Sequence, residues 1–484
     1  MNIEQKLIGR ECEKAALNSY FSSGRSEFIA VYGRRRVGKT FLIRKCVDDK
    51  FAFFMTGVHG ASKTDQLLNF SIAMQKYTAS ATISIQRNWL LAFHSLAQHL
   101  ETLPEGNKYV FIDELPWMDT PKSGFIAALE NFWNSWASLR NDIKLIVCGS
   151  ATSWMINNLI HNRGGLHNRL THHIIVNPFT LHECEEYFAT YHFGYSRKQI
   201  AECYMIMGGI PYYMSMLDRS RSLAQNIDQL FFSDNAELAD EFSDLYRALF
   251  RKSNTHVSVV TALAAKGIGM TRQELVKATG VVDNGLFSTV LEELEQCGFI
   301  RTYEPFGSSD TSNGKRQKRN TIFQLVDFYT MFYFKFIKRN NYHDPHFWST
   351  SLNSPTHNTW AGLSFEMLCM SHVEAIKRKL GISGVQTIVC SWRSTSTEGN
   401  GAQIDLLIDR KDDTVNVCEM KYCNSEYTID RNYEERLSQR LQTFAKETQT
   451  KKSLILTLVT TFGLKQNEHS AIVQQQIVLD DLFG

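Results

Sequence analysis

Long apolar runs are absent from this sequence: none reaches the roughly 18 consecutive apolar residues of a membrane-spanning helix. The polar start, MNIEQKLIGRECEK, also has no apolar segment of signal-peptide length. The ten cysteines are scattered singly, without the CxxC pairs of zinc ribbons and thiol redox sites. These absences argue against a membrane partner, and they predict a cytoplasmic protein with reduced thiols.

No charge of one sign predominates either. The chain has 52 Lys and Arg residues against 50 Asp and Glu, so any attraction to nucleic acid must come from a local basic patch. The hydrophobic fraction of 43% and the charged fraction of 21% are typical of folded globular proteins. Because a single core rarely extends past about 300 residues, the 484 residues predict at least three domains.

The first part of the chain has the pattern of an α/β fold. Between residues 28 and 176, short apolar runs alternate with amphipathic stretches, which predicts a mainly parallel sheet with helices. From residue 181 to 252, apolar residues recur at three- and four-residue spacing, which predicts helices. We therefore expect an α/β core over residues 1–178 and a helical lid over residues 179–252.

The next region predicts a winged helix. Three helical stretches precede two strand-like runs, FIRTYEPF and TIFQLV, that would form a hairpin. We expect this domain over residues 253–338, a linker over residues 339–359 and a second α/β domain over residues 360–484. The polar loop of the hairpin would be the wing, and it contains four basic residues: Lys315, Arg316, Lys318 and Arg319.

The segment GRRRVGKT fits the phosphate-binding pattern G-x-x-x-x-G-K-[ST]. It lies between the strand-like run FIAVY and a helical stretch, which is the context that this motif requires. Backbone N–H groups would hold the phosphates of ATP, the lysine would contact the β- and γ-phosphates, and the threonine would bind Mg²⁺. The predicted nucleotide-binding residues are Gly33, Arg34, Arg35, Arg36, Val37, Gly38, Lys39, Thr40 and Phe41.

Two more strand ends carry polar residues suited to this site. The run KYVFID ends in Asp113, which would hold Mg²⁺ together with Thr40, and Glu114 would polarise the attacking water. The run LIVCGS ends in Ser150, which would sense the γ-phosphate or orient the water. Each feature is ordinary by itself, but the combination in this order predicts an ATPase.

These residues resemble the AAA+-related, STAND-type P-loop ATPases known as the archaeal ATPase family. The resemblance also includes the opening IGRE and the segments FIDELPW, CGSATSWM and GGIPYYM, and it covers about the first half of the chain. It implies that Gly208, Gly209 and Pro211 lie in the lid near the nucleotide, although an ordinary helix break explains them equally well. Arg163 or Arg169 could reach a γ-phosphate in cis or across a subunit interface; simple surface arginines are equally compatible.

The predicted winged helix gives conflicting signals about DNA. Its third helix carries Glu292, Glu293 and Glu295, whereas a helix that reads bases normally presents basic or amide side chains. The basic wing could contact DNA phosphates without reading the sequence. A winged helix that only packs between the ATPase and the C-terminal domain explains the pattern equally well.

The last domain contains carboxylates and a lysine in a suggestive order. Glu419 and Lys421 alternate on one strand and therefore share a face, Asp405 lies on the preceding strand, and Glu366 lies on a helix before them. Such a group could hold Mg²⁺, activate a water and stabilise the charge of a cleaved phosphodiester. Alternating Glu and Lys are also common on the solvated face of a strand.

The order of these elements resembles the restriction-endonuclease-like PD-(D/E)xK fold, which often forms the C-terminal domain in this ATPase family. The resemblance implies catalytic roles for Asp405, Glu419 and Lys421, and a metal shell of Glu366, Asp405 and Glu419. One departure is that no proline precedes Asp405, where Gln403 and Ile404 stand.

Two functions are compatible with the sequence. In the first, the ATP state gates magnesium-dependent DNA cleavage by the C-terminal domain. In the second, the protein is a regulatory ATPase switch that binds DNA, a partner protein or further copies of itself, and the nuclease-like domain is inactive.

Overall fold

The computed structural model describes residues 6–78, 82–161, 169–250, 253–267, 269–307, 321–340, 342–394 and 402–484. The chain divides into two compact units. The first comprises residues 1–178 with two short returning segments, 210–212 and 247–251, and the second comprises the rest. None of the helices in the described ranges is long and apolar enough to cross a membrane. All ten cysteines are free thiols.

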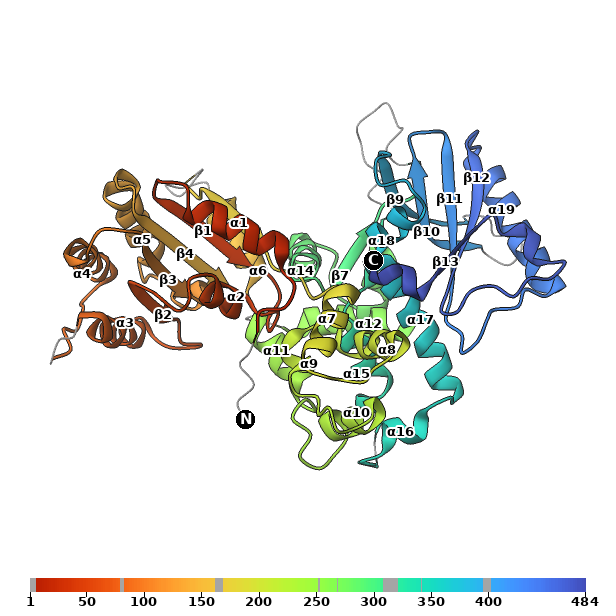
Figure 1. Cartoon of the computed structure of the whole chain (residues 1–484), viewed down its shortest axis with the longest axis horizontal. Helices are drawn as coiled ribbons and strands as arrows, with labels where there is room; N and C mark the ends of the chain where they lie inside the picture. The colour runs from red at the N-terminus through yellow and green to blue at the C-terminus, as the bar shows by residue number, and fades with distance from the viewer. Residues whose placement is uncertain are drawn as a thin grey trace. The chain divides into compact units, whose positions relative to one another are not determined.

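The first unit is built on a five-stranded parallel sheet with the order β2-β3-β4-β1-β5 (Figure 1). Parallel pairing of every neighbouring strand confirms the predicted α/β core. The central strands β1 and β4 are buried along their whole length, as expected for a sheet covered on both faces. The strands are β1 (Glu27–Tyr32), β2 (Phe53–Thr56), β3 (Lys108–Asp113), β4 (Ile143–Gly149) and β5 (His172–Ile175).

One face of this sheet carries the main core of the first unit. Alternate residues of β1, such as Phe28 and Ala30, pack with Phe70, Trp89 and Trp133 from three helices. These helices are α3 (Lys63–Thr78), α4 (Trp89–Thr102) and α5 (Phe125–Ser135). The unit also contains α1 (Glu11–Phe21), α2 (Lys39–Cys46), α6 (Thr152–Met155) and the one-turn helix η1 (Leu115–Trp117).

The helices of the predicted lid belong to the second unit, except for the start of α9 and the end of α11, which belong to the first. They are α7 (Leu181–Thr190), α8 (Arg197–Met207), α9 (Pro211–Met214), α10 (Leu223–Phe231) and α11 (Glu241–Leu249). Three helices and a three-stranded sheet of order β6-β8-β7 follow: α12 (Asn254–Lys266), β6 (Met270–Thr271), α13 (Arg272–Thr279), α14 (Gly285–Gln296), β7 (Ile300–Tyr303) and β8 (Ile322–Leu325).

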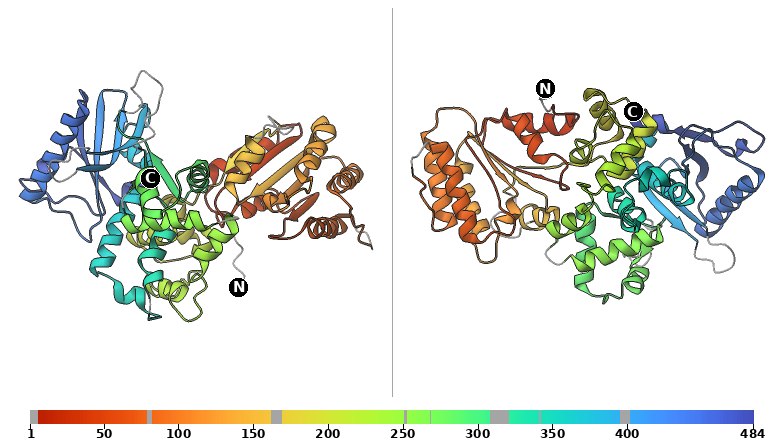
Figure 2. Two further views of the ribbon diagram at one scale, coloured as in Figure 1. Left: turned by 180° about the vertical axis from the view of Figure 1, so that it is seen from behind. Right: turned by 90° about the horizontal axis from the view of Figure 1, so that it is seen from below.

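The last part contains a second five-stranded sheet, of order β13-β12-β11-β10-β9, in which β9, β10 and β11 pair antiparallel and β11, β12 and β13 pair parallel. Helix α19 (Arg431–Thr448) packs through Tyr433, Leu437 and Phe444 onto one face of it (Figure 2). The strands are β9 (Thr387–Arg393), β10 (Gln403–Arg410), β11 (Thr414–Lys421), β12 (Ser453–Thr460) and β13 (Gln475–Val478). Two helices, α17 (Pro355–Ser371) and α18 (Val373–Lys379), precede them.

The segment 339–359, which the sequence predicts to be a linker, contains regular structure instead. It holds α16 (Phe347–Ser351) and the first turn of α17. Ser354 caps α17 and Pro355 occupies its first turn, where a missing N–H has no cost. Trp348 is buried and packs edge-on against Trp360, so the segment belongs to a core together with α15 (Phe328–Lys335).

Candidate nucleotide site and C-terminal carboxylate cluster

The phosphate-binding loop connects β1 to α2 and depends on two glycines. Gly33 has φ 145°, and a Cβ there would lie 2.2 Å from the carbonyl oxygen of Val176, so a larger residue cannot fit without moving the chain after β5. Gly38 has φ 91° and immediately precedes α2; a Cβ there would meet no atom within 4 Å. The loop therefore closes tightly at its start and leaves open space where α2 begins.

Lys39 is buried in this loop. Its Nζ donates hydrogen bonds to the carbonyl oxygens of Gly33 at 2.9 Å and Arg34 at 2.8 Å, so the ammonium group lies within the turn that would surround phosphates. Arg10 is also buried, and it donates a hydrogen bond to the carbonyl oxygen of Val37 in this loop at 3.2 Å. In the sequence, Arg10 is only part of the opening motif IGRE; this contact gives it a structural role.

The start of α2 and the ends of β3 and β4 are joined by hydrogen bonds. Thr40 donates through Oγ1 to Asp113 Oδ2 at 2.9 Å, which joins the start of α2 to the end of β3. Glu114 follows in a left-handed conformation with φ 48°. Its Oε2 accepts hydrogen bonds from the backbone N–H of Ser150 at 3.1 Å and from the Ser150 hydroxyl at 2.8 Å, which joins β3 to β4.

Glu114 is in an environment that makes it a better base than an exposed carboxylate. Burial raises the pKa of Glu114; the charge of Lys39 opposes this rise and the charge of Asp113 adds to it. A higher pKa increases the driving force for accepting a proton from water. For Mg²⁺, the Thr40 hydroxyl and the Asp113 carboxylate lie side by side, and hard oxygen ligands of this kind fit the ion.

Arg36, one of the predicted nucleotide-binding residues, contacts an aromatic ring. Arg36 lies over the ring of Tyr212, with the guanidinium carbon 4.4 Å from its centroid. Tyr212 belongs to the short segment 210–212 that returns to the first unit, so the residue after Pro211 contacts the phosphate-binding loop.

Arg169 is at the other edge of the sheet. The N–H of Thr171, two residues later, bonds to Phe28 at the start of β1, whereas the phosphate-binding loop follows the end of β1. The backbone separation is about 15 Å along the strand, further than an arginine side chain reaches. The structure therefore does not bring Arg169 to the phosphate loop of the same chain, and a role across a subunit interface stays a prediction. Arg163 lies outside the described residues.

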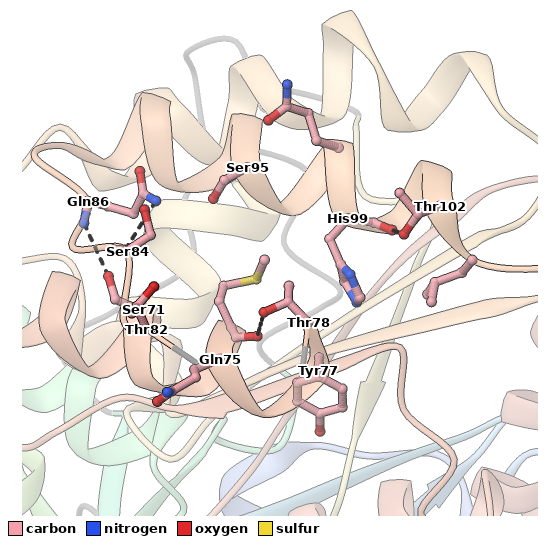
Figure 3. Close-up of a pocket in the computed structure, with 13 residues that line it drawn as sticks. Ser71, Gln75, Tyr77, Thr78, Thr82, Ser84, Gln86, Ser95, His99 and Thr102 are labelled. Atoms are coloured by element: carbon pink, nitrogen blue, oxygen red, sulfur yellow. Dashed lines mark hydrogen bonds between the residues drawn. The ribbon is translucent and has the colours of Figure 1, made fainter. Parts of the chain in front are cut away.

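The first unit also has a hollow of about 570 Å³ between α3 and α4. Figure 3 shows hydroxyl and amide side chains around it, with His99 on the α4 side. None of the predicted nucleotide-binding residues lines this hollow, so it is a feature separate from the phosphate-binding loop.

The C-terminal carboxylates are gathered around Glu419. Glu419 Oε1 accepts from Lys421 Nζ at 2.8 Å, which confirms that the two residues share one face of β11. The same oxygen accepts from the hydroxyl of Tyr433 at 2.5 Å, and Oε2 accepts from the guanidinium of Arg440. Tyr433 and Arg440 belong to α19 and were not among the predicted site residues. Asp405 accepts from Gln403 at 2.6 Å on β10.

The carboxylates of this cluster differ in the direction in which their pKa is shifted. Burial raises the pKa of Glu366 to about 8, and the charge of Asp405 adds to the rise. Burial also raises the pKa of Asp405. Burial acts on Glu419 in the same direction, but Lys421 and Arg440 outweigh it and lower the pKa of Glu419. Glu419 is therefore an ionised carboxylate held by cations.

This arrangement does not fit a bound metal as it stands. Within the described ranges, no group of three or more His, Cys, Asp or Glu side chains is placed to hold a metal ion. Both oxygens of Glu419 are occupied by protein donors. The charges of Glu366, Asp405 and Glu419 thus influence one another's pKa. The three carboxylates are nevertheless not arranged around one vacant centre.

The basic residues that were predicted to contact DNA lie outside the part of the chain that the structure describes. They are Lys315, Arg316, Lys318 and Arg319. The third helix of the predicted winged helix, α14, exposes Glu292 and Glu295, while Glu293 pairs with His256 at 2.7 Å.

The part of the chain that contains the phosphate-binding loop matches a known protein family. Residues 7–217 match a family model described as an ATPase domain predominantly from Archaea. An uncharacterized protein of Methanocaldococcus jannaschii is 25% identical over 338 residues, which is 69% of this chain and 69% of that protein. The family match supports a P-loop ATPase that binds and hydrolyses ATP in this part of the chain.

Two solved structures are also similar. A Walker-type ATPase of Pyrococcus abyssi has a TM-score of 0.47 and 16% identity, over 68% of this chain and 96% of that one. The ORC2 protein of Aeropyrum pernix has a TM-score of 0.39 and 15% identity, over 66% of this chain and 90% of that one.

Proposed function

We propose that this protein hydrolyses MgATP at the loop of residues 33–41, with Glu114 as the general base. The observation that carries the proposal is the pair of contacts that join the start of α2 to the ends of β3 and β4: Thr40 with Asp113, and Glu114 with Ser150. The bound ion would neutralise charge on the β- and γ-phosphates. Thr40 and Asp113 would hold that ion, and Lys39 would exchange its two loop carbonyls for phosphate oxygens.

Glu114 and Ser150 have separate tasks in this proposal. Glu114 accepts a proton from the attacking water, and its raised pKa favours that transfer. Ser150 holds the carboxylate by two hydrogen bonds and so fixes the direction from which the base approaches. Arg34, Arg35 and Arg36 add positive charge beside the phosphates, and Phe41 stands in the first turn of α2.

Substitution Lys39→Ala tests the nucleotide site. We expect it to abolish ATP binding, because it removes the ammonium group from the centre of the loop. Isothermal titration with ATP and Mg²⁺ measures this directly, with Lys45→Ala in the last turn of α2 as the matched control. An ATP affinity equal to that of the wild type would refute the proposed site.

We further propose that the nucleotide state gates a magnesium-dependent DNA nuclease in the C-terminal domain, with Asp405, Glu419 and Lys421 as catalytic residues and Glu366 as an added metal ligand. Contacts inside the second unit support a mechanical link. Glu202 of α8 accepts from the hydroxyl of Tyr422 at 2.5 Å, and Tyr422 is the residue after Lys421. A movement of the lid helix α8 would therefore pull on the end of β11.

A second contact ties the lid to the helix that carries Glu366. The first N–H of α7, from Leu181, donates to Nε2 of His372 at 3.1 Å, and His372 directly follows α17. The domains in this proposal keep the predicted limits: a helical lid over residues 179–252, a winged helix over residues 253–338 and a nuclease-like domain over residues 360–484. The wing would hold DNA phosphates through its four basic residues.

The alternative is a regulatory switch in which the C-terminal domain only docks onto DNA, a partner protein or another copy of the chain. One observation favours it: both oxygens of Glu419 are engaged by Tyr433, Lys421 and Arg440. A carboxylate whose two oxygens both accept from protein donors acts as a structural ion pair and has no oxygen left for a metal ion.

A cleavage assay distinguishes the two functions. Labelled linear, nicked and single-stranded DNA is incubated with the protein and Mg²⁺ or Mn²⁺, with and without ATP. Cleavage that disappears in Lys421→Ala, but persists in the exposed-site control Lys411→Ala, supports the nuclease. Absence of cleavage in every condition would favour the switch and leave the ATPase proposal untouched.

A further inference from the structure

Gln66, near the start of α3, is fully buried although its side chain is polar. The same helix contributes Leu67 and Phe70 to the core of the first unit. A buried amide is costly unless hydrogen bonds compensate it, and Gln66 forms three with the backbone. Its Oε1 accepts from the N–H of Val58 at 3.1 Å, and its Nε2 donates to the carbonyl oxygens of Val58 at 2.6 Å and Trp117 at 3.0 Å. Gln66 thus joins α3 to two other segments: the residues after β2 and the turn η1.

Both of these segments contact the backbone of Glu114. After β2, the N–H of Gly57 donates to the carbonyl oxygen of Asp113 at 2.9 Å, and a Cβ on Gly57 would lie 2.7 Å from the carbonyl oxygen of Glu114. In η1, the N–H of Trp117 donates to that same carbonyl oxygen of Glu114 at 3.0 Å. The peptide group of Glu114 is therefore in contact with both segments that the Gln66 amide joins.

Glu114 needs such support because its backbone is left-handed, with φ 48°. A residue with a Cβ retains this conformation only where its surroundings hold it. On the β4 side, a Cβ on Gly149 would lie 2.8 Å from Pro116, so the turn is packed against the end of that strand. On the α3 side, the Gln66 amide gives the hydrogen bond that holds η1. The direction of the Glu114 carboxylate depends on this turn, because the side chain extends from its backbone.

We propose that Gln66 is a positioning residue for Glu114: its amide holds η1 and the residues after β2 together and so keeps the carboxylate directed at the attacking water. Ser150 holds the carboxylate itself, and Gln66 holds the backbone from which it extends. Gln66 acts through this turn and takes no part in binding ATP. The inference rests on the proposed role of Glu114 as the general base and adds a residue that orients it.

Substitution Gln66→Met tests this role, because methionine has a similar length and suits an apolar core but cannot form the three hydrogen bonds. The matched control is Asn69→Leu: the Asn69 amide lies three residues further along α3 and donates to the carbonyl oxygen of Thr56 in β2 at 2.8 Å. Phosphate release under saturating ATP gives the rate, and isothermal titration gives the affinity. Both substitutions are also made in the Glu114→Gln background, where the base is already absent.

We expect Gln66→Met to lower kcat at least about tenfold while the Kd for ATP changes by less than about twofold. In the Glu114→Gln background it should lower the rate no further, since two residues that act through one carboxylate are not additive. Asn69→Leu should keep the wild-type rate. An unchanged kcat in Gln66→Met, a loss of ATP affinity as large as the loss of rate, an equal loss of rate in Asn69→Leu, or a further loss in the Glu114→Gln background would each overturn the proposal.

A milder variant keeps the test decisive if Gln66→Met does not fold. Gln66→Asn has an amide that is one methylene shorter and so cannot reach both segments at hydrogen-bond distance. We expect it to lower kcat in the same direction, and a wild-type kcat in folded Gln66→Asn would refute the role. Thermal unfolding followed by circular dichroism verifies that the variants are folded.

Hydrogen exchange shows whether the turn itself has loosened. In the nucleotide-free protein, the amides of Trp117 and Met118 should exchange faster in Gln66→Met than in the wild type or Asn69→Leu, and equal exchange would refute the role. Faster exchange with an unchanged kcat would also refute it and leave the ATPase proposal untouched. A wild type that binds ATP but does not hydrolyse it would refute the proposed function, and the positioning role with it.

Discussion

In the proposed mechanism, Glu114 combines a structural and a chemical task. Its backbone turns the chain after β3 with φ 48°, and its half-buried carboxylate accepts a hydrogen bond from Ser150. Burial disfavours the charged form, whereas Lys39 stabilises it, and the net effect is a raised pKa. The residue is thus ready to take a proton while it remains held in a fixed direction.

We predict that Glu114→Gln binds ATP with wild-type affinity but hydrolyses it at least about 100-fold more slowly, because the amide cannot act as a base. Phosphate release under saturating ATP measures the rate, and titration measures the affinity. Ser150→Ala is the comparison: it keeps the base but loses one of its two hydrogen bonds, so its loss of rate should be smaller. Undiminished hydrolysis by Glu114→Gln would remove its assigned role.

At the scale of elements, His372 links two helices that are far apart in sequence. Its Nε2 accepts from the first N–H of α7, and its Nδ1 lies 2.9 Å from the carbonyl oxygen of Leu368 in α17. These partners require a neutral ring with the proton on Nδ1. Burial lowers the pKa of His372, and the bond to Leu368 partly opposes this.

The sign of the pH dependence follows from this lowered pKa. The neutral ring is favoured in the folded state, so its contribution to stability is complete above the ordinary value of 6.5 and is lost as the pH falls below it. We predict that the free energy of unfolding falls more steeply between about pH 7 and pH 5 in the wild type than in His372→Gln. Urea titrations at each pH measure this, and His94→Gln, at an exposed position of α4, should keep the wild-type slope.

At the scale of the whole molecule, the chain itself connects the nucleotide site to the second unit. The segment 210–212 belongs to the first unit and is flanked on both sides by residues of the second. Within the first unit Tyr212 contacts Arg36 of the phosphate-binding loop. On the other side of this segment, Gly208 and Gly209 end α8 in left-handed conformations, and α8 carries Glu202.

We predict that Tyr422→Phe leaves ATP hydrolysis unchanged but uncouples the end of β11 from the nucleotide, because the hydroxyl that binds Glu202 is removed. Hydrogen exchange measured by mass spectrometry, with and without ATP, should show a nucleotide-dependent change in the β11 peptides of the wild type that is lost in the variant. Tyr342→Phe, at a side chain that is 96% exposed, is the control. A retained change in Tyr422→Phe would exclude this route.

The sequence by itself determined the features that depend on local pattern. Alternating apolar runs specify a parallel sheet, and the glycine and lysine spacing of residues 33–40 specifies the phosphate-binding loop, because both follow from backbone geometry over a few residues. The polar ends of β3 and β4 could be placed beside this loop because parallel strands end at one edge. The shared face of Glu419 and Lys421 follows from the two-residue period of a strand.

Only the tertiary structure decided which distant residues meet. Arg169 is remote from the phosphate-binding loop because β5 runs parallel to β1 and begins at the opposite edge, a relation that no local pattern contains. Residues 339–359 form α16 and the start of α17 because Trp348 and Trp360 find a common core. Arg440 reaches Glu419 only after α19 packs onto the sheet, since contacts between a helix face and a strand are set by packing and not by sequence spacing.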